Sequence, residues 1–413
     1  NRSQFSPGGS VSFIPTSAFD GFRSDAVNYV KLRASYGTAP GFPAPYRTRN
    51  VLALNPQAFV TANGNVISTS VSNTLANPDL KPELSKEYEV GIEARLLNNR
   101  LNFEATYYNR ETEDQIFTRS LPPESGFLFT TENVGNVKNE GIEISFNATP
   151  VELENFDWRI GGQFTKNEST VEGIVGDQFL YGGLFSTPQN AAINGEPLGV
   201  IFGSRVARDE NGNMLVDENG FWIQDSEDGI IGDPNPDWFA TLNTGFTYKN
   251  WNLSMQWEYQ QGGDIYATTI GALIGRGVVK SSENQDPTQS VILPGVREAT
   301  GEPNDIQITM TEAYFDIIGF GLDEQLIYDA THLRLREASL GFNMPKRLLE
   351  NTPFGTLNLS LVGQNLFVKA FNTPDDVNYD PELNSLGVGN SQGFDYLTSW
   401  NSRRYGLSVK LTF

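Results

Sequence analysis

The stretch WNLSMQWEYQ, residues 251–260, decides the fold, because apolar and polar side chains alternate along it without a break. Trp251, Leu253, Met255, Trp257 and Tyr259 fall on one face, and amide, hydroxyl and carboxylate side chains fall on the other. A period of two is typical of a β-strand that is apolar on one face only. The stretch therefore predicts a strand between an apolar and a polar medium.

The same alternation recurs along the whole chain. Clear examples are residues 87–96, 101–107, 142–148, 156–160, 239–248, 357–361 and 405–413. Weaker examples are residues 5–16, 29–37 and 331–343, and the face at 110–118 is interpreted as the extension of a long strand. These segments predict eleven strands of about ten residues each.

The connections between these strands alternate between short and long. The short ones are 97–100, 150–155, the two-residue turn 249–250 and 345–355. The long ones are polar and rich in Gly, Pro and Asn: 38–85, 119–130, 166–238, 262–330 and 368–401. In outer-membrane barrels the short turns are periplasmic and the long loops extracellular, which predicts a periplasmic end for Phe413. A soluble sandwich or propeller does not require this arrangement.

The fold class that follows is all-β, an antiparallel transmembrane β-barrel with short periplasmic turns and long extracellular loops. Aromatic side chains near the strand ends of the apolar face predict the girdles of such a barrel. Bacterial single-chain barrels have even strand numbers, whereas eleven is odd. We therefore expect residues 1–413 to be one C-terminal portion of a larger barrel.

Composition excludes several classes of protein. No run approaches the 18 or so apolar residues of a membrane helix, and the 12% aromatic content argues against disorder. The net charge of −21 disfavours binding to nucleic acid. The chain has no Cys, and its one His, His332, is expected to be a hydrogen-bonded structural residue. The absence of Cys excludes thiol catalysis and disulfides, and the single His disfavours a multi-histidine metal site.

Several motifs then resemble those of one family, the SusC-like TonB-dependent transporters. They are Gly232-Asp-Pro-Asn-Pro-Asp237 before Trp238, Leu333-Arg-Leu-Arg-Glu337 with Ser339-Leu-Gly-Phe342, and Gly363-Gln-Asn-Leu-Phe367. Lys31-Leu-Arg-Ala-Ser-Tyr-Gly37 and Asn77-Pro-Asp-Leu-Lys-Pro-Glu83 are similar to segments shared more widely among TonB-dependent receptors. A C-terminal Phe is also the usual ending of such barrels.

The resemblance implies a 22-stranded barrel in the outer membrane of a Gram-negative, Bacteroidetes-type bacterium, of which this chain is about the last eleven strands. It implies an N-terminal plug and a TonB-contacting segment, neither of which is in this sequence. The implied partners are a SusD-like surface lipoprotein, the TonB complex, outer-membrane lipid and an oligosaccharide or peptide substrate. The expected function is active import of an oligomeric nutrient, glycan or peptide, without catalytic residues.

Loop aromatics are the candidate contacts to substrate or lid, because aromatic rings pack against the apolar faces of sugars and side chains. These candidates are Tyr181, Phe185, Trp222, Trp238, Tyr396 and Trp400. The alternative for Tyr396 and Trp400, which precede the last strand, is a girdle at the outer interface. On the polar face, a further set is expected to pair with the plug or with one another: Glu89, Glu93, Arg95, Glu104, Arg334 and Arg336.

The acidic loop at 209–229 contains the only candidate metal site. Asp209, Asn211, Asn213 and Asp217 have oxygen ligands at the spacing that begins a calcium loop. The glycine falls at the fourth position rather than the sixth, and position twelve is Gly220 instead of Glu. A structural Ca²⁺ is therefore one interpretation, a solvated acidic hairpin is the other, and no other cofactor is expected.

Two other functions remain open from the sequence. A siderophore or cobalamin receptor of the same superfamily would lack the lipoprotein lid. A secreted β-rich adhesin or glycan-binding module would be extracted without detergent. The long loops and the Gly232–Asp237 motif favour the SusC-like interpretation over both.

Overall fold

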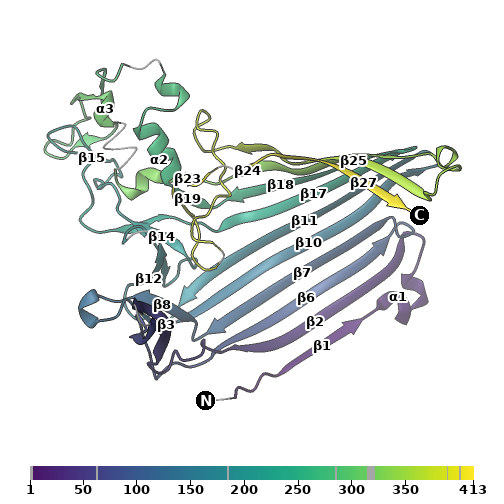
Figure 1. Cartoon of the computed structure of the whole chain (residues 1–413), viewed down its shortest axis with the longest axis horizontal. Helices are drawn as coiled ribbons and strands as arrows, with labels where there is room; N and C mark the ends of the chain where they lie inside the picture. Colours follow the sequence, from purple (N-terminus) through teal and green to yellow (C-terminus); the bar gives the residue numbers. More distant parts are fainter. Residues whose placement is uncertain are drawn as a thin grey trace.

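The computed structural model describes residues 3–61, 64–183, 186–283, 286–313, 321–387, 389–399 and 401–413. Its body is one eleven-stranded antiparallel sheet in which each main strand pairs with the next one along the chain (Figure 1). The main strands are β1 (Gly8–Phe13), β2 (Val27–Gly41), β6 (Glu83–Leu96), β7 (Leu101–Glu113), β10 (Asn136–Leu153), β11 (Phe156–Glu172), β17 (Pro236–Tyr248), β18 (Trp251–Gly262), β24 (His332–Asn343), β25 (Thr356–Ala370) and β27 (Arg404–Thr412). The predicted strand number is confirmed.

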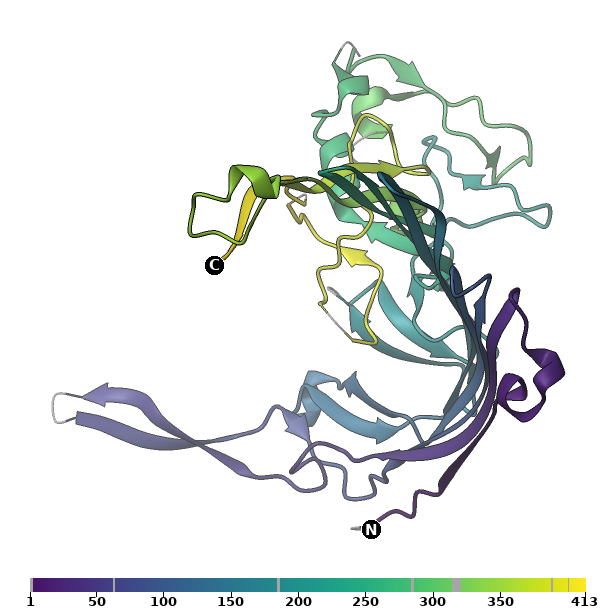
Figure 2. The same ribbon diagram turned by 90° about the vertical axis from the view of Figure 1, so that its right-hand side faces the viewer.

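The sheet curves into part of a barrel wall, with β1 and β27 as its two open edges (Figure 2). Paired residues of an antiparallel ladder share a face of the sheet. Trp257 pairs with Leu242 and Leu335, so apolar side chains form one continuous face. Its neighbour Glu258 pairs with Thr241 and Arg334 on the other face, which is the concave, luminal one.

The alternation of short and long connections is confirmed, because the long loops all emerge at one end of the sheet and the tight turns at the other (Figure 1). Phe413 follows β27 at the end with the short turns. Among the described residues, no helix is both long and apolar enough to cross a membrane.

Several predicted boundaries are wrong in detail; β11, for example, runs to Glu172, past the predicted start of a loop at 166. The segment 150–155 is not all turn: β10 continues to Leu153, and Pro150 lies where the register shifts between Ala148 and Val151. A bulge accepts proline because the residue there need not donate to the ladder. The segment 110–118 is divided, since β7 ends at Glu113 and a separate strand begins at Ile116.

The long loops fold into small sheets and helices of their own. The strands are β3 (Leu52–Thr61), β4 (Gly64–Val71), β5 (Thr74–Leu75), β8 (Ile116–Ser120), β9 (Phe129–Asn133), β12 (Gln178–Gly183), β13 (Gln189–Ile193), β14 (Val200–Gly203), β15 (Leu215–Val216), β16 (Gly229–Gly232), β19 (Asp264–Ala267), β20 (Ser290–Val291), β21 (Val296–Arg297), β22 (Ile308–Thr309), β23 (Ile327–Asp329) and β26 (Phe394–Asp395). The helices are α1 (Pro15–Ala18), in a turn, and α2 (Thr268–Gly275) and α3 (Met310–Glu312), in the loops.

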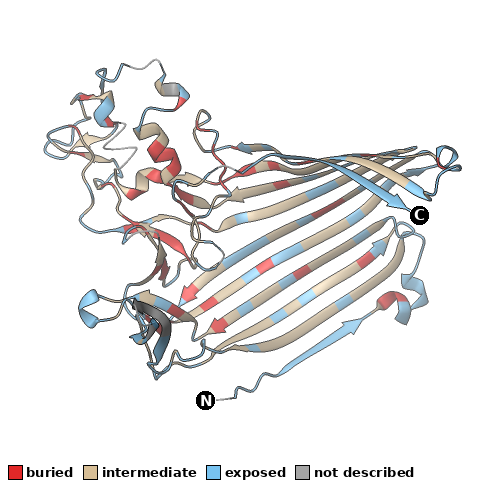
Figure 3. Ribbon diagram, viewed as in Figure 1, coloured by how far each residue is buried: buried red, intermediate tan, exposed pale blue. Residues whose placement is uncertain are grey.

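Buried apolar side chains concentrate in this loop layer rather than in the main sheet (Figure 3). One cluster joins Ile265 and Ile270 to Val377 and Tyr379 of the last loop. A second joins Ile201 to Tyr266 and Phe394. Burial of apolar surface stabilises these loops, whereas the main strands rely on the ladder and leave their apolar face open.

Candidate functional site

The luminal wall carries a charged network centred on Arg33 of β2. The Arg33 guanidinium donates to Glu104 of β7 at 2.5 Å and lies 3.2 Å from Glu89 of β6. The Glu93 carboxylate is shared by two cations and lies 3.5 Å from Arg33 and 2.8 Å from Lys31. The period of two places all these side chains on the concave face of three adjacent strands. Glu89, Glu93 and Glu104 are thus paired, but with Lys31 and Arg33, which lie outside the predicted set.

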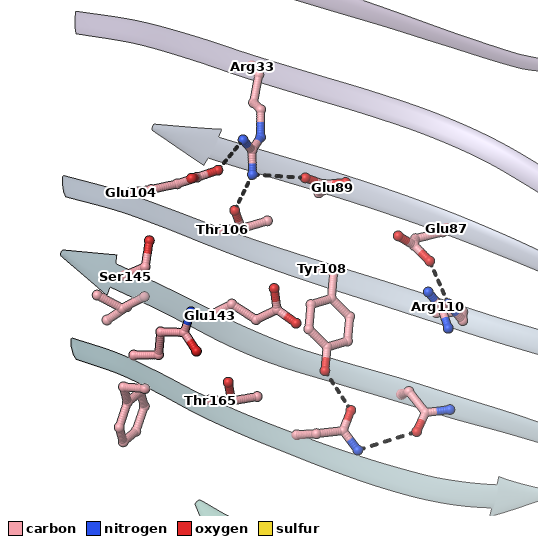
Figure 4. Close-up of a pocket in the computed structure, with 15 residues that line it drawn as sticks. Arg33, Glu87, Glu89, Glu104, Thr106, Tyr108, Arg110, Glu143, Ser145 and Thr165 are labelled. Atoms are coloured by element: carbon pink, nitrogen blue, oxygen red, sulfur yellow. Dashed lines mark hydrogen bonds and ion pairs between the residues drawn. The ribbon is translucent and has the colours of Figure 1, made fainter. Parts of the chain in front are cut away.

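This network borders a pocket of about 700 Å³ on the luminal face (Figure 4). Two cations, Arg33 and Arg110, face four carboxylates there, those of Glu87, Glu89, Glu104 and Glu143. Arg110 donates to Glu87 at 2.5 Å, and Tyr108 donates its hydroxyl proton to Asn167 at 2.9 Å. The formal charge of the lining is therefore −2, so the pocket favours neutral or cationic groups over anions.

A second network ties the last long loop, residues 371–403, to the same face of the sheet. Arg334 of β24 is 1% exposed and makes a bidentate ion pair with Asp380 of that loop. Arg336 bridges Glu258 of β18, at 2.6 Å, and Glu382 of the loop. Both arginines face the lumen because they lie two residues apart in β24, and the bulge at Arg336 brings Glu337, opposite Gln256, onto the same face.

The electrostatics of this attachment favour the charged form of Asp380. Burial alone would raise the pKa of its carboxyl, but hydrogen bonds and charge from Arg334 outweigh burial and leave the pKa below its usual value. Asn401 also donates to Asp380, at 2.8 Å. His332 is buried beside the network, with Nδ1 2.8 Å from the Ala330 carbonyl and Nε2 3.7 Å from Glu258, as expected for a structural histidine.

The Gly232–Asp237 motif joins three long loops. Asn235 donates to the Leu198 carbonyl at 3.0 Å and accepts a hydrogen bond from Gln392 at 2.9 Å. Asn190, which is fully buried, donates to the Gln392 carbonyl and accepts from its backbone N–H. Asp233 donates its N–H to the Asp264 carboxylate at 2.8 Å. The motif thus fixes the loop layer over the lumen.

The predicted aromatic contacts do not gather at one place. Tyr181 is buried against Phe117 inside the loop layer, and burial raises its pKa. Trp238 stacks on Tyr259, 5.0 Å between centroids, and packs near Phe164 on the apolar face of the sheet. That position matches a girdle residue at the loop end of the barrel.

The other predicted aromatics lie in the loops. Trp222 is half-buried against the cluster of Leu293 and Ile308, and its indole donates to the Pro294 carbonyl at 2.9 Å. Tyr396 is 47% exposed, directly after β26. Phe185 and Trp400 lie outside the described residues.

The candidate calcium residues form two successive tight turns. The Asp209 carboxylate accepts from the N–H groups of Asn211 and Asn213 at 2.9 and 2.8 Å, and the Asp217 carboxylate accepts similarly from Asn219 and Phe221. A hydrogen bond from the Asn213 side-chain amide, together with the backbone ones, lowers the pKa of Asp209. In the part of the chain that the structure describes, no group of three or more His, Asp or Glu is arranged to hold a metal ion. Calcium binding stays a prediction.

Sequence reasoning missed the residues that attach the last loop. Asp380 and Glu382 are separated from their arginines by 46 residues and stand in a segment without periodicity. Asp323, which accepts from Ser204, Thr187 and Tyr266, was also missed. The only available signal was the pair of arginines on the polar face of one strand, whose charges need carboxylate partners when buried.

Comparisons with known proteins agree with this architecture. The family model described as TonB dependent receptor-like, beta-barrel matches residues 1–282. TonB-dependent receptor P3 of Formosa agariphila is 28% identical over 453 residues, which cover 100% of this chain and 42% of that protein. TonB-dependent receptor SusC of Bacteroides thetaiotaomicron is 28% identical over 205 residues, 46% of this chain and 20% of that protein.

Among solved structures, the RagAB peptide importer in its closed-closed state has the same fold. Its TM-score is 0.71 at 20% identity, over 100% of this chain and 44% of that chain. The chain spans less than half the length of the curated relatives it matches. The predicted SusC-like character is confirmed by these matches, and the chain belongs to the family described as TonB dependent receptor-like, beta-barrel.

Proposed function

We propose that the full-length protein imports an oligomeric nutrient, a glycan or a peptide, across the outer membrane. The observation that carries the proposal is the loop layer above a polar lumen, in which Gln392 ties the last loop to Asn190 and Asn235 of a second loop, and Asp233 ties that second loop to Asp264 of a third. A rigid, folded layer at one end of the wall is suited to hold a large ligand and a lid. Small chelated-metal ligands do not require a platform of this size.

The partners follow from the same proposal. A SusD-like surface lipoprotein covers the loop layer, and the TonB complex supplies energy through a segment that precedes this chain in the receptor. The long loops face the outside of the cell and Phe413 the periplasm. Exposed Tyr396 and half-buried Trp222 are the candidate contacts to substrate or lid, with Phe185 and Trp400 as further candidates. Similarity to SusC and to the RagAB peptide importer supports both substrate classes.

The experiment is purification of the native receptor from detergent-extracted outer membranes, with identification of co-purifying chains, followed by uptake assays on cells. A co-purifying lipoprotein and uptake of labelled oligosaccharides or peptides that stops when the proton gradient is collapsed support the proposal. Uptake of a ferric siderophore or cobalamin without a lipoprotein would contradict it and favour the siderophore or cobalamin receptor.

A further inference from the structure

An apolar groove lies on the convex side of the wall, the side that faces away from the lumen. It has a volume of about 640 Å³ and is formed over β10, β11, β17 and β18, with Leu333 of β24 at its border. These strands occupy the middle of the sheet, inside both open edges (Figure 1). The groove is therefore a surface that this chain forms by itself, whatever fills the lumen or pairs with the edge strands.

A small residue enclosed by aromatic rings forms the floor of the groove. Ala240 of β17 pairs with Phe164 of β11 on one side and with Tyr259 of β18 on the other. Trp238, the next residue on the same face of β17, stacks on Tyr259 at 5.0 Å between ring centroids and packs near Phe164 at 5.7 Å. Three rings thus surround one methyl group, which leaves a depression where a larger side chain would fill the wall.

A glycine beside this floor extends the depression. Gly162 of β11 pairs with Phe146 of β10 and with Leu242 of β17, which also line the groove. A Cβ atom on Gly162 would stand 2.6 Å from the Phe146 ring, so the ring lies over bare backbone. The groove follows from the placement of Ala240 and Gly162 on adjacent strands among bulky apolar side chains.

The described residues that line the groove offer it almost no polar group. Gln163, Thr241 and Glu258 border it only through their backbone, because their side chains are on the luminal face, and that backbone is bonded within the ladder. The Tyr259 hydroxyl donates to the Gln261 amide oxygen at 2.9 Å. A sugar or a polypeptide backbone would leave its own polar groups without partners here, whereas a hydrocarbon chain has none to satisfy.

The depth of the groove places it in the leaflet next to the long loops. From Ala240 to Tyr248, the aromatic residue at the short-turn end of β17, the chain advances eight residues. At about 3.3 Å per residue and a strand tilt of about 40°, this is about 20 Å along the barrel axis, in an apolar band about 25 Å tall. The face becomes polar just beyond the groove, where Lys166 follows Phe164 on β11 and pairs with Glu168 at 2.6 Å.

We infer that the groove binds one acyl chain of a membrane lipid from the leaflet next to the long loops. The lipid headgroup lies at the level of Lys166, and the chain runs from there over Ala240. A chain in the groove is in contact with side chains around it, whereas a chain on a flat wall is in contact on one side only, so the groove retains a lipid that the rest of the wall exchanges. The inference does not depend on what the receptor imports, because it requires only that the wall spans the membrane.

The test uses the full-length receptor purified in detergent from its own outer membrane. Native mass spectrometry measures the fraction of receptor that keeps a bound lipid after exhaustive detergent exchange. The variant Ala240→Leu fills the floor of the groove. The matched control, Ala34→Leu, makes the same change on the same face of β2, in a regular part of the ladder. Heat modifiability and the trypsin pattern show whether each variant folds.

We expect Ala240→Leu to reduce the lipid-bound fraction at least about fivefold, because leucine displaces one or two methylene groups of the chain from the groove. Ala34→Leu should change that fraction by less than about a factor of two, as is usual for an exposed position. Equal retention in the two variants would overturn the inference, because the retained lipid would then be bound elsewhere. A wild-type receptor that keeps no lipid would overturn it as well.

A second measurement remains informative when a variant fails to fold. A photo-crosslinking amino acid replaces Leu242, which lines the groove, or Leu361, which lies on the same apolar face of β25 outside it. The cells are illuminated and the adducts are identified by mass. More lipid adduct at position 242 than at position 361 supports the inference. Equal lipid adducts indicate the ordinary lipid shell only, and a crosslink at position 242 to a second receptor or another protein identifies a protein as the occupant; both results overturn it.

Discussion

Replacing Arg334 by Met tests the attachment of the last loop to the wall. The change leaves Asp380, 4% exposed, without its bidentate partner in a buried setting. Removing one partner of a buried ion pair costs about 3–5 kcal/mol. At about 1.4 kcal/mol for each factor of ten, the open state of residues 371–403 should become more populated by two to three and a half powers of ten.

The assay uses an introduced thiol, because the sequence contains no cysteine. Val377 is 3% exposed within the cluster that the last loop shares with α2, so Val377→Cys should react slowly with a maleimide. In the Arg334→Met background the labelling rate, followed by peptide mass mapping, should rise strongly. Lys369→Ala, which breaks the exposed Lys369–Asp375 pair, is the control and should cost at most about 1 kcal/mol.

A second substitution and the pH dependence test the Arg334–Asp380 pair further. Adding Asp380→Asn to Arg334→Met removes the unpaired buried charge, so protection should partly return. The pKa of Asp380 is lower in the folded state than its ordinary value. The stability that the ion pair contributes is therefore complete above the ordinary aspartate pKa, near 3.9, and is lost only as the pH falls through the lower folded value. Protection should thus be equal at pH 7 and pH 5. Slow labelling that persists in Arg334→Met would refute the attachment.

Three other changes test the wall and the acidic loop. Leu361→Arg places a charge on the apolar face of β25 and should cost about 2–4 kcal/mol of barrel stability. Barrel assembly, measured as the amount of detergent-extracted, heat-modifiable receptor, should therefore fall. The control Ser360→Arg, on the luminal face, should assemble normally. Gly141→Ala places a Cβ 2.4 Å from the Lys166 carbonyl and 2.5 Å from the Tyr108 hydroxyl, so its thermal unfolding temperature should fall, while Gly245→Ala, with no atom closer than 3.9 Å, should be neutral. Asp209→Ala removes the carboxylate that caps the turn, so tryptic cleavage at Arg208 should become faster, by the same factor in calcium and in chelator. If calcium instead protects the wild type and not the variant, the loop is a calcium site.

The sequence predicted the main sheet well because a single physical rule governs it. Each strand separates an apolar from a polar medium, so the period of two runs through the main strands and is interrupted only locally, at bulges such as those at Pro150 and Arg336. The lengths of the connections followed from the same rule, because they are the residues between one alternating segment and the next. The error at 150–155 arose because Pro150 looks like a turn residue, although a bulge within β10 accommodates it.

The loop layer could not be predicted in the same way. Its contacts are irregular and join residues far apart in the chain, such as Asn190 with Gln392, 202 residues away. No periodicity marks an asparagine that will be buried between two loops. The Gly232–Asp237 motif was recognised as a resemblance, but its physical role, the anchoring of Asn235 and Asp233 to neighbouring loops, required the structure.

The distribution of charge in the lumen has a consequence for what can pass. The net charge of −21 suggests an acidic lumen that retains cations. The charged level of the wall is partly neutralised: Glu258 is paired with Arg336, whereas Arg33 is shared by three glutamates, so carboxylates stay in excess there. Ion pairs of this kind reduce the net field, and the excess of carboxylates leaves the wall weakly acidic, so anions are disfavoured there. Under the proposed function, a polar oligomer would be held at this wall by many weak hydrogen bonds that exchange easily, which favours movement over tight retention.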